Sequence, residues 1–236
     1  EMRQFSVVNG TAKSVNTALV YYQLSQIQEE LGDEELKETE KWKVIGAKIL
    51  KNLNTDDKSV WHKRILMPDQ NKFTKTEITE DPSKAFQRIT TATSFIVSLR
   101  PIISFADKKV LYGKTINEKV DILTQIINAW WTCLAQLMPD AFNDPSNYVV
   151  QKTAGIFSLH MLLRDKLQAA KIARLQLDSS DVYLSMLEGG YNCMMSKYWS
   201  TKEEDENDAE ANQFGSMAGF KELYDRIDEE LMMNDY

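Results

Sequence analysis

The hydrophobic residues of this chain recur mainly with a helical period. Apolar positions three and four residues apart predict amphipathic helices, and Ser, Gly and Pro mark several of their ends. A Gly189-Gly190 pair weakens one of them. The predicted helices cover residues 14–31, 34–53, 89–99, 116–137, 148–175, 180–196 and 217–232.

Two stretches depart from this period and predict a small β element. Residues 4–8 form a short apolar run closed by Asn9-Gly10, which is typical of a strand that ends in a tight turn. Residues 54–83 contain several helix breakers around two stretches of alternating character. That alternation predicts a short hairpin or an extended excursion.

These elements together predict a fold that is mainly α with a small β element, of the α+β class. Residues 1–83 would form the end of an α/β part, with two helices and the short β excursion. Residues 84–236 would form a helical domain with an acidic loop near 202–210. Because the chain starts at Glu1 and its first strand needs partners, we expect most of the α/β part to lie upstream.

Composition narrows the class of protein. With 43% hydrophobic and 27% charged residues, the chain is close to the average of soluble globular proteins. No stretch approaches the roughly 20 apolar residues of a membrane span, and no signal peptide is evident. Cys133 and Cys193 lie far apart in apolar helical contexts, which argues against a disulfide framework. We expect a cytoplasmic protein with no membrane partner.

Charge is segregated along the chain although the net charge is −7. Residues 41–114 contain fifteen basic and seven acidic residues, whereas residues 29–40 and 201–224 are acidic. This basic segment could form an anion-binding face on an acidic protein. The alternative is a set of solvated helix faces of opposite sign that neutralise one another on folding.

Motifs for catalysis are sparse. The two histidines, His62 and His160, stand outside HExxH and have no cysteine at ligand spacing, so we expect no metal site. The phosphate-binding patterns GxxxxGKS and GxGxxG are absent, and the paired carboxylates are solvated. We therefore expect no cofactor and no complete catalytic site in this chain. Whether the whole protein is an enzyme stays open, because an upstream part could bind a nucleotide.

A tetrad at residues 61–64 offers chemistry for nucleic-acid contact. Trp61 could stack on a base while Lys63 and Arg64 pair with phosphates. The alternative is an edge strand whose Trp61 packs inward while Lys63 protects the edge from aggregation. His160, among apolar neighbours on a predicted helix, is either a core histidine or a base contact.

A second aromatic feature lies at Trp130-Trp131, on a dense apolar helix face. Core packing explains such a face. The alternative is a surface for a partner protein or for a homo-oligomer.

Five stretches of the chain form a recognisable series of motifs: Phe5 to Asn9 with Lys13 to Val15, Ile89 to Phe95, Ile126 to Leu134, Tyr148 to Leu159 and Phe214 to Leu223. In this order they resemble motifs of the DGQHR-domain family, which includes DndB-like regulators of DNA modification. The Asp-Gly-Gln-His-Arg tract itself is absent from the chain, and in the family it lies upstream of the strand that corresponds to residues 5–9.

The resemblance implies a prokaryotic, DNA-associated protein that acts in DNA modification or phage defence, with a ParB-like α/β part upstream. Asn9, Lys13, Lys152 and Thr153 match family motif positions without a settled role. On physical grounds Asn9 could be a turn former, and Lys13 could hold a phosphate at a helix N-terminus. Lys152 and Thr153 precede Gly155, which would let another helix approach closely.

We therefore expect this chain to bind DNA and not to catalyse. The alternative is a helical scaffold or oligomerisation module that binds a protein partner. The expected nucleic-acid contacts are Lys13, Trp61, Lys63, Arg64, Arg88 and Arg100.

Overall fold

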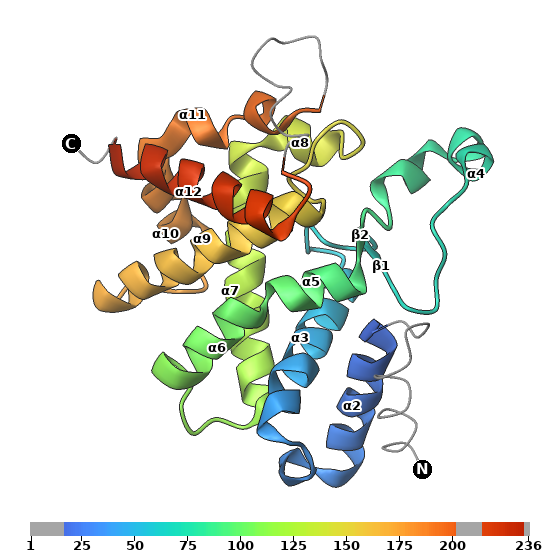
Figure 1. The fold of residues 1–236 in the computed structure, drawn as a ribbon, viewed down its shortest axis with the longest axis vertical. Coiled ribbons are helices and arrows are strands. Elements are labelled where there is room, and N and C mark those ends of the chain that lie inside the picture. Colours follow the sequence, from blue (N-terminus) through green and yellow to red (C-terminus); the bar gives the residue numbers. More distant parts are fainter. Residues whose placement is uncertain (1–16, 202–213, 234–236) are drawn as a thin grey trace.

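The computed structural model describes residues 17–201 and 214–233 (Figure 1). The predicted strand at 4–8, the positions Asn9 and Lys13, and the acidic loop lie outside these residues. The described helices are α2 (Thr17–Leu31), α3 (Glu38–Thr55), α4 (Lys75–Glu80), α5 (Ala92–Ser98), α6 (Arg100–Lys109), α7 (Ile116–Leu137), α8 (Pro139–Asn143), α9 (Thr153–Ile172), α10 (Ser180–Leu187), α11 (Tyr191–Met194) and α12 (Met217–Met233). Short 3-10 turns cover Asp33–Glu35, Pro82–Phe86, Glu188–Gly190 and Ser196–Trp199.

Two strands complete the described elements and confirm a mainly α fold with a small β element. β1 (Ile65–Leu66) and β2 (Thr90–Thr91) pair in parallel. The predicted hairpin is therefore wrong, because parallel strands need a crossover connection instead of a tight turn. The crossover, residues 67–89, carries α4 and projects from the body of the molecule (Figure 1). We call it the arm.

Helix α4 occupies part of the stretch whose alternation predicts an extended chain. The Thr74 hydroxyl accepts a hydrogen bond from the Glu77 backbone N–H, and the Glu77 carboxylate accepts one from the Thr74 N–H. This reciprocal capping box starts a helix although alternation favours a strand.

Pro101 has the opposite role from the predicted one. The pattern predicts that it ends a helix over 89–99, but α5 already ends at Ser98 and Pro101 lies in the first turn of α6. Proline is well tolerated there because its missing N–H has no partner in the first turn of a helix. By contrast, α7 has the predicted bounds, with a Thr115/Glu118 capping box at its start.

One hydrophobic cluster runs through the described residues. α3 packs on α2, α5, α6 and α7, while α9 packs on α5, α6 and α12. The core therefore crosses the predicted boundary at residue 83, so that residues on both sides of it share one interior. The arm contributes no buried residue to it.

Candidate nucleic-acid interface

Trp61 lies in the core instead of on the surface. Its side chain is 0% exposed and makes edge-to-face contacts with Phe95 (4.8 Å between ring centroids) and Trp131 (4.7 Å). A buried ring cannot stack on a nucleotide base, so the expected contact through Trp61 is wrong for this conformation. The ring packs inward, as in the alternative interpretation of this segment.

Arg64 is also directed inward. Its Nη1 donates hydrogen bonds to the Phe142 carbonyl oxygen (3.0 Å) and to the Gln151 side-chain oxygen. Burial lowers the pKa of the guanidinium from its ordinary value. Arg64 thus joins the turn before β1 to the chain around α8. Its guanidinium has a structural position in place of the expected nucleic-acid contact.

Lys63 and Arg88 are brought together by the fold although they lie far apart in the sequence. The Arg88 backbone N–H donates to the Lys63 carbonyl oxygen (3.0 Å), at the base of the arm. Both residues have left-handed backbone conformations, with φ of 58° and 53°. Such conformations cost free energy in residues other than glycine, so the surrounding structure must hold them in place.

Phe73 on the arm completes this cluster, and no sequence pattern singles it out. The Arg88 guanidinium lies 3.9 Å from the Phe73 ring centroid, and Lys84 Nζ lies 5.3 Å from it. Arg88 Nη1 also donates to the Asn71 carbonyl oxygen (2.6 Å). We call Lys63, Phe73, Lys84 and Arg88 the basic corner.

Two carboxylates, those of Glu77 and Asp81, interact with the charges of the basic corner. The hydrogen bond from the Thr74 backbone N–H lowers the pKa of Glu77, and the charges of Lys84 and Arg88 act in the same direction. Since Glu77 also caps α4, its charge offsets the corner only in part.

Arg100 lies beyond the other end of α5. It is exposed, and its guanidinium lies 5.2 Å from the ring centroid of Trp42, which in turn makes an edge-to-face contact with Tyr21 (5.8 Å). Trp42 is half-buried, so it replaces Trp61 as an aromatic side chain that solvent can reach. The sequence could have suggested it through the neighbouring Lys41 and Lys43.

The cations at these positions are not neutralised by ion pairs. Within residues 17–201 and 214–233, Lys63, Arg88 and Arg100 form no ion pair with a carboxylate. Their charge is therefore available to an external anion.

His160 is a core residue, which is one of the two alternatives for it. It is 0% exposed, and its Nε2 accepts a hydrogen bond from Trp131 Nε1 (3.0 Å). Its Nδ1 must then carry the proton and donate to Ser98 Oγ (2.8 Å), which donates to the Phe95 carbonyl oxygen (2.7 Å). Every polar atom of the ring is satisfied while the ring stays neutral. Burial lowers the pKa of His160 to about 3.

This burial predicts a loss of stability in acid. In the unfolded chain His160 binds a proton below its ordinary pKa of about 6.5, whereas the folded chain resists protonation until about pH 3. The free energy of unfolding should therefore fall by up to about 1.4 kcal/mol per pH unit between these values. In urea unfolding at pH 7 and pH 4.5, His160→Gln should show a shallower pH dependence, because glutamine can keep both hydrogen bonds and does not titrate. Equal pH dependence in both proteins would contradict this assignment.

Lys152 and Thr153 have structural positions at the start of α9. Lys152 precedes the helix, and its Nζ donates to the Ser146 carbonyl oxygen (2.7 Å), while Thr153 is the first helical residue. Burial lowers the pKa of Lys152. The sequence predicts close packing of Gly155 against another helix, but its nearest neighbours are the carbonyl oxygens of Val149 and Val150 in the preceding loop.

The Trp130-Trp131 pair does not offer a partner surface. Both side chains are 0% exposed, and Trp130 makes an edge-to-face contact with Tyr183 (5.5 Å). Core packing explains the pair, so the expected partner or homo-oligomer contact through it is wrong for this conformation.

The described part of the chain contains no group of three or more His, Cys, Asp or Glu placed to hold a metal ion. Cys133 and Cys193 are buried, and burial raises the pKa of each thiol to about 12. No helix there has the length and apolar character needed to cross a membrane. Comparisons with protein-family models, with curated proteins and with solved structures found no match to this chain.

Proposed function

We propose that this chain binds DNA through the basic corner and Arg100, as part of a DGQHR/DndB-like regulator of DNA modification or phage defence. The observation that carries the proposal is the joining of Lys63 and Arg88 at the base of the arm, with no ion pair to a described carboxylate. The role proposed for this chain is binding.

The backbone of the basic corner favours phosphate contact. Main-chain hydrogen bonds fix the backbone of Lys63 and Arg88, and the Arg88 guanidinium donates to the Asn71 carbonyl oxygen. Stacking on Phe73 further orders the Arg88 guanidinium. Ordering the cations in advance reduces the entropy cost of binding, and arginine suits phosphate because its planar donors can form two parallel hydrogen bonds.

Helix α5 sets the spacing of the two ends of this surface. Arg88 precedes β2 and α5, and Arg100 lies two residues after the end of α5. Seven helical residues rise by roughly 10 Å, which supports contacts of Arg88 and Arg100 with separate phosphates. Contacts of this kind fix position and add affinity but do not read sequence.

Salt-dependent DNA binding tests the proposal. The affinity of the chain for a fluorescein-labelled duplex should fall steeply between about 50 and 200 mM salt, because each phosphate contact releases counterions. Lys63→Gln and Arg88→Gln should each lower the slope of log affinity against log salt by about 0.9. Lys197→Gln removes an exposed lysine of the Ser196–Trp199 turn, which is outside the basic corner, and should leave the slope unchanged.

Either of two results would overturn the proposal that the basic corner binds DNA. If the chain has no measurable affinity at low salt, or if all three variants lower the slope equally, the basic corner is not a DNA contact. Circular dichroism of each variant shows that the fold is retained.

A further inference from the structure

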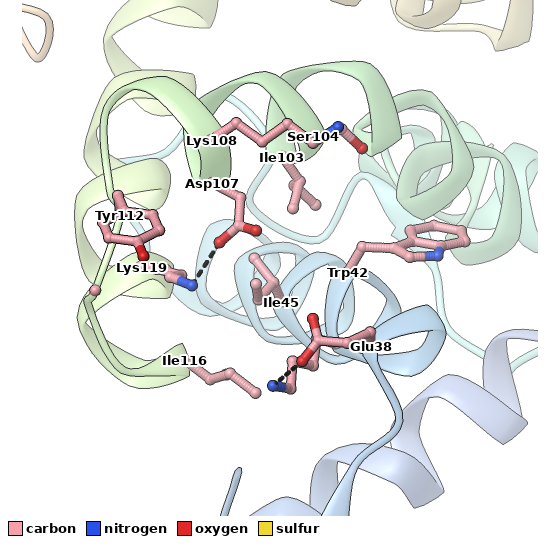
Figure 2. A pocket seen from close by; sticks show the side chains of 12 residues that line it. Glu38, Trp42, Ile45, Ile103, Ser104, Asp107, Lys108, Tyr112, Ile116 and Lys119 are labelled. Carbon is pink, nitrogen blue, oxygen red and sulfur yellow. Dashed lines mark hydrogen bonds and ion pairs between the residues drawn. The ribbon is translucent and has the colours of Figure 1, made fainter. Parts of the chain in front are cut away.

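A cavity of about 350 Å³ opens beside α3, and none of the basic-corner residues lines it (Figure 2). The first half of α3, the face of α6 and the start of α7 surround it. Ile45, Ile103 and Ile116 line its inner part and are at most 3% exposed. The cavity therefore has an apolar floor, and its volume is within the range of small-molecule sites.

Two aromatic side chains flank this floor from opposite sides (Figure 2). Trp42 of α3 is half-buried, whereas Tyr112, in the connection between α6 and α7, is 89% exposed. The connection turns at Gly113, which has a φ of 79° and open space on the side where a Cβ would lie. Aromatic walls over an apolar floor suit a planar ring.

The rim of the cavity carries an excess of positive charge. Lys41 pairs with Glu38, and Lys119 pairs with Asp107. Lys108 also lines the cavity and is exposed, and it forms no ion pair with another described residue. An anionic group on a ligand would find an unpaired cation here, next to the Ser104 hydroxyl.

We propose that this cavity binds a nucleoside monophosphate. The base would lie over the isoleucine floor between Trp42 and Tyr112, and the phosphate would contact Lys108. The carboxylates of Glu38 and Asp107 are acceptors for amino groups of the base. The cavity shares no lining residue with the basic corner, but Trp42 also contacts Arg100, so the site adjoins one end of the proposed DNA surface.

Tryptophan fluorescence provides a direct test. The chain has five tryptophans, and Trp61, Trp130, Trp131 and Trp199 are 0% exposed, so Trp42 is the indole that a ligand can reach. Titration with AMP, GMP, CMP and UMP should give saturable quenching with at least one of them. Trp42→Phe should abolish the quenching, and calorimetry with that variant should still detect weakened binding.

Paired lysine variants test the phosphate contact. Lys108→Ala should weaken the affinity about tenfold, which corresponds to about 1.4 kcal/mol. Lys109→Ala is the matched control, because the neighbouring lysine is exposed and lies outside the lining of the cavity. Thermal unfolding of both variants verifies that they fold.

Three outcomes would overturn the proposal. The first is the absence of saturable quenching and of binding heat with all four nucleotides. The second is an equal loss of affinity in Lys108→Ala and Lys109→Ala. The third is equal affinity for inorganic phosphate alone, which would show that the ring makes no contribution.

Discussion

Replacing Gly155 by alanine should destabilise the protein by about 3 kcal/mol or more, at the upper end of overpacking effects. A Cβ at this position would lie 2.2 Å from the Val150 carbonyl oxygen and 2.5 Å from that of Val149. These are backbone atoms and cannot rotate away as a flexible side chain would. The 149–150 loop would have to move, and with it Gln151, which accepts a hydrogen bond from the half-buried Arg64.

Urea unfolding followed by circular dichroism measures this loss. Gly215→Ala is the matched control, since no atom lies within 4 Å of its Cβ position. The control should change the free energy of unfolding by no more than about 0.5 kcal/mol. If Gly155→Ala were as stable as the control, the described contact between the loop and α9 would be incorrect.

Replacing Trp61 by alanine should cost about 3–5 kcal/mol of stability, the usual range for a large aromatic residue in a core. The indole is 0% exposed and lies between Phe95 and Trp131, so its removal leaves a cavity at the centre of the aromatic cluster. Any loss of DNA affinity should then follow from unfolding and not from a missing surface contact.

The adjacent Lys63→Ala variant separates the two roles of this segment. It should retain the unfolding midpoint of the unchanged protein and lose DNA affinity, the reverse of the behaviour expected for Trp61→Ala. A stable Trp61→Ala protein with weakened DNA binding would instead support the base-stacking role that the buried position of Trp61 argues against.

Local signals explain which elements could be predicted from the sequence. The predicted bounds of α7 are correct because its capping box and the proline that follows it act within a few residues. The prediction for Pro101 is wrong because a proline is compatible with either side of a helix boundary, and only the packing of α5 and α6 decides between them. The predicted hairpin is wrong for a related reason. β1 and β2 are joined by a long connection, and the local sequence pattern does not specify its path.

Local sequence patterns are also insufficient to predict which residues of the candidate nucleic-acid interface are exposed. Composition indicates that residues 41–114 are basic, but it cannot distinguish Arg64, which is half-buried and hydrogen-bonded to the Phe142 carbonyl oxygen, from Arg88, which contacts Phe73. Trp42 and Trp61 both have lysine neighbours, and tertiary packing buries Trp61 while leaving Trp42 half-exposed. Whether a side chain faces inward depends on contacts between distant segments, and alternation along one segment does not specify them.

The parallel pairing of β1 with β2 also determines how the arm can change over evolutionary time. Paired strands lie about 4.8 Å apart, so the two ends of the arm emerge side by side from the body. None of residues 67–89 is buried, although Met67 packs against the core, so a change in length beyond Met67 should leave the core intact. Doubling a flexible loop costs only about 0.6 kcal/mol in closure entropy. We therefore expect the arm beyond Met67 to tolerate insertions and deletions, so that a lineage could remodel this edge of the molecule while conserving its interior.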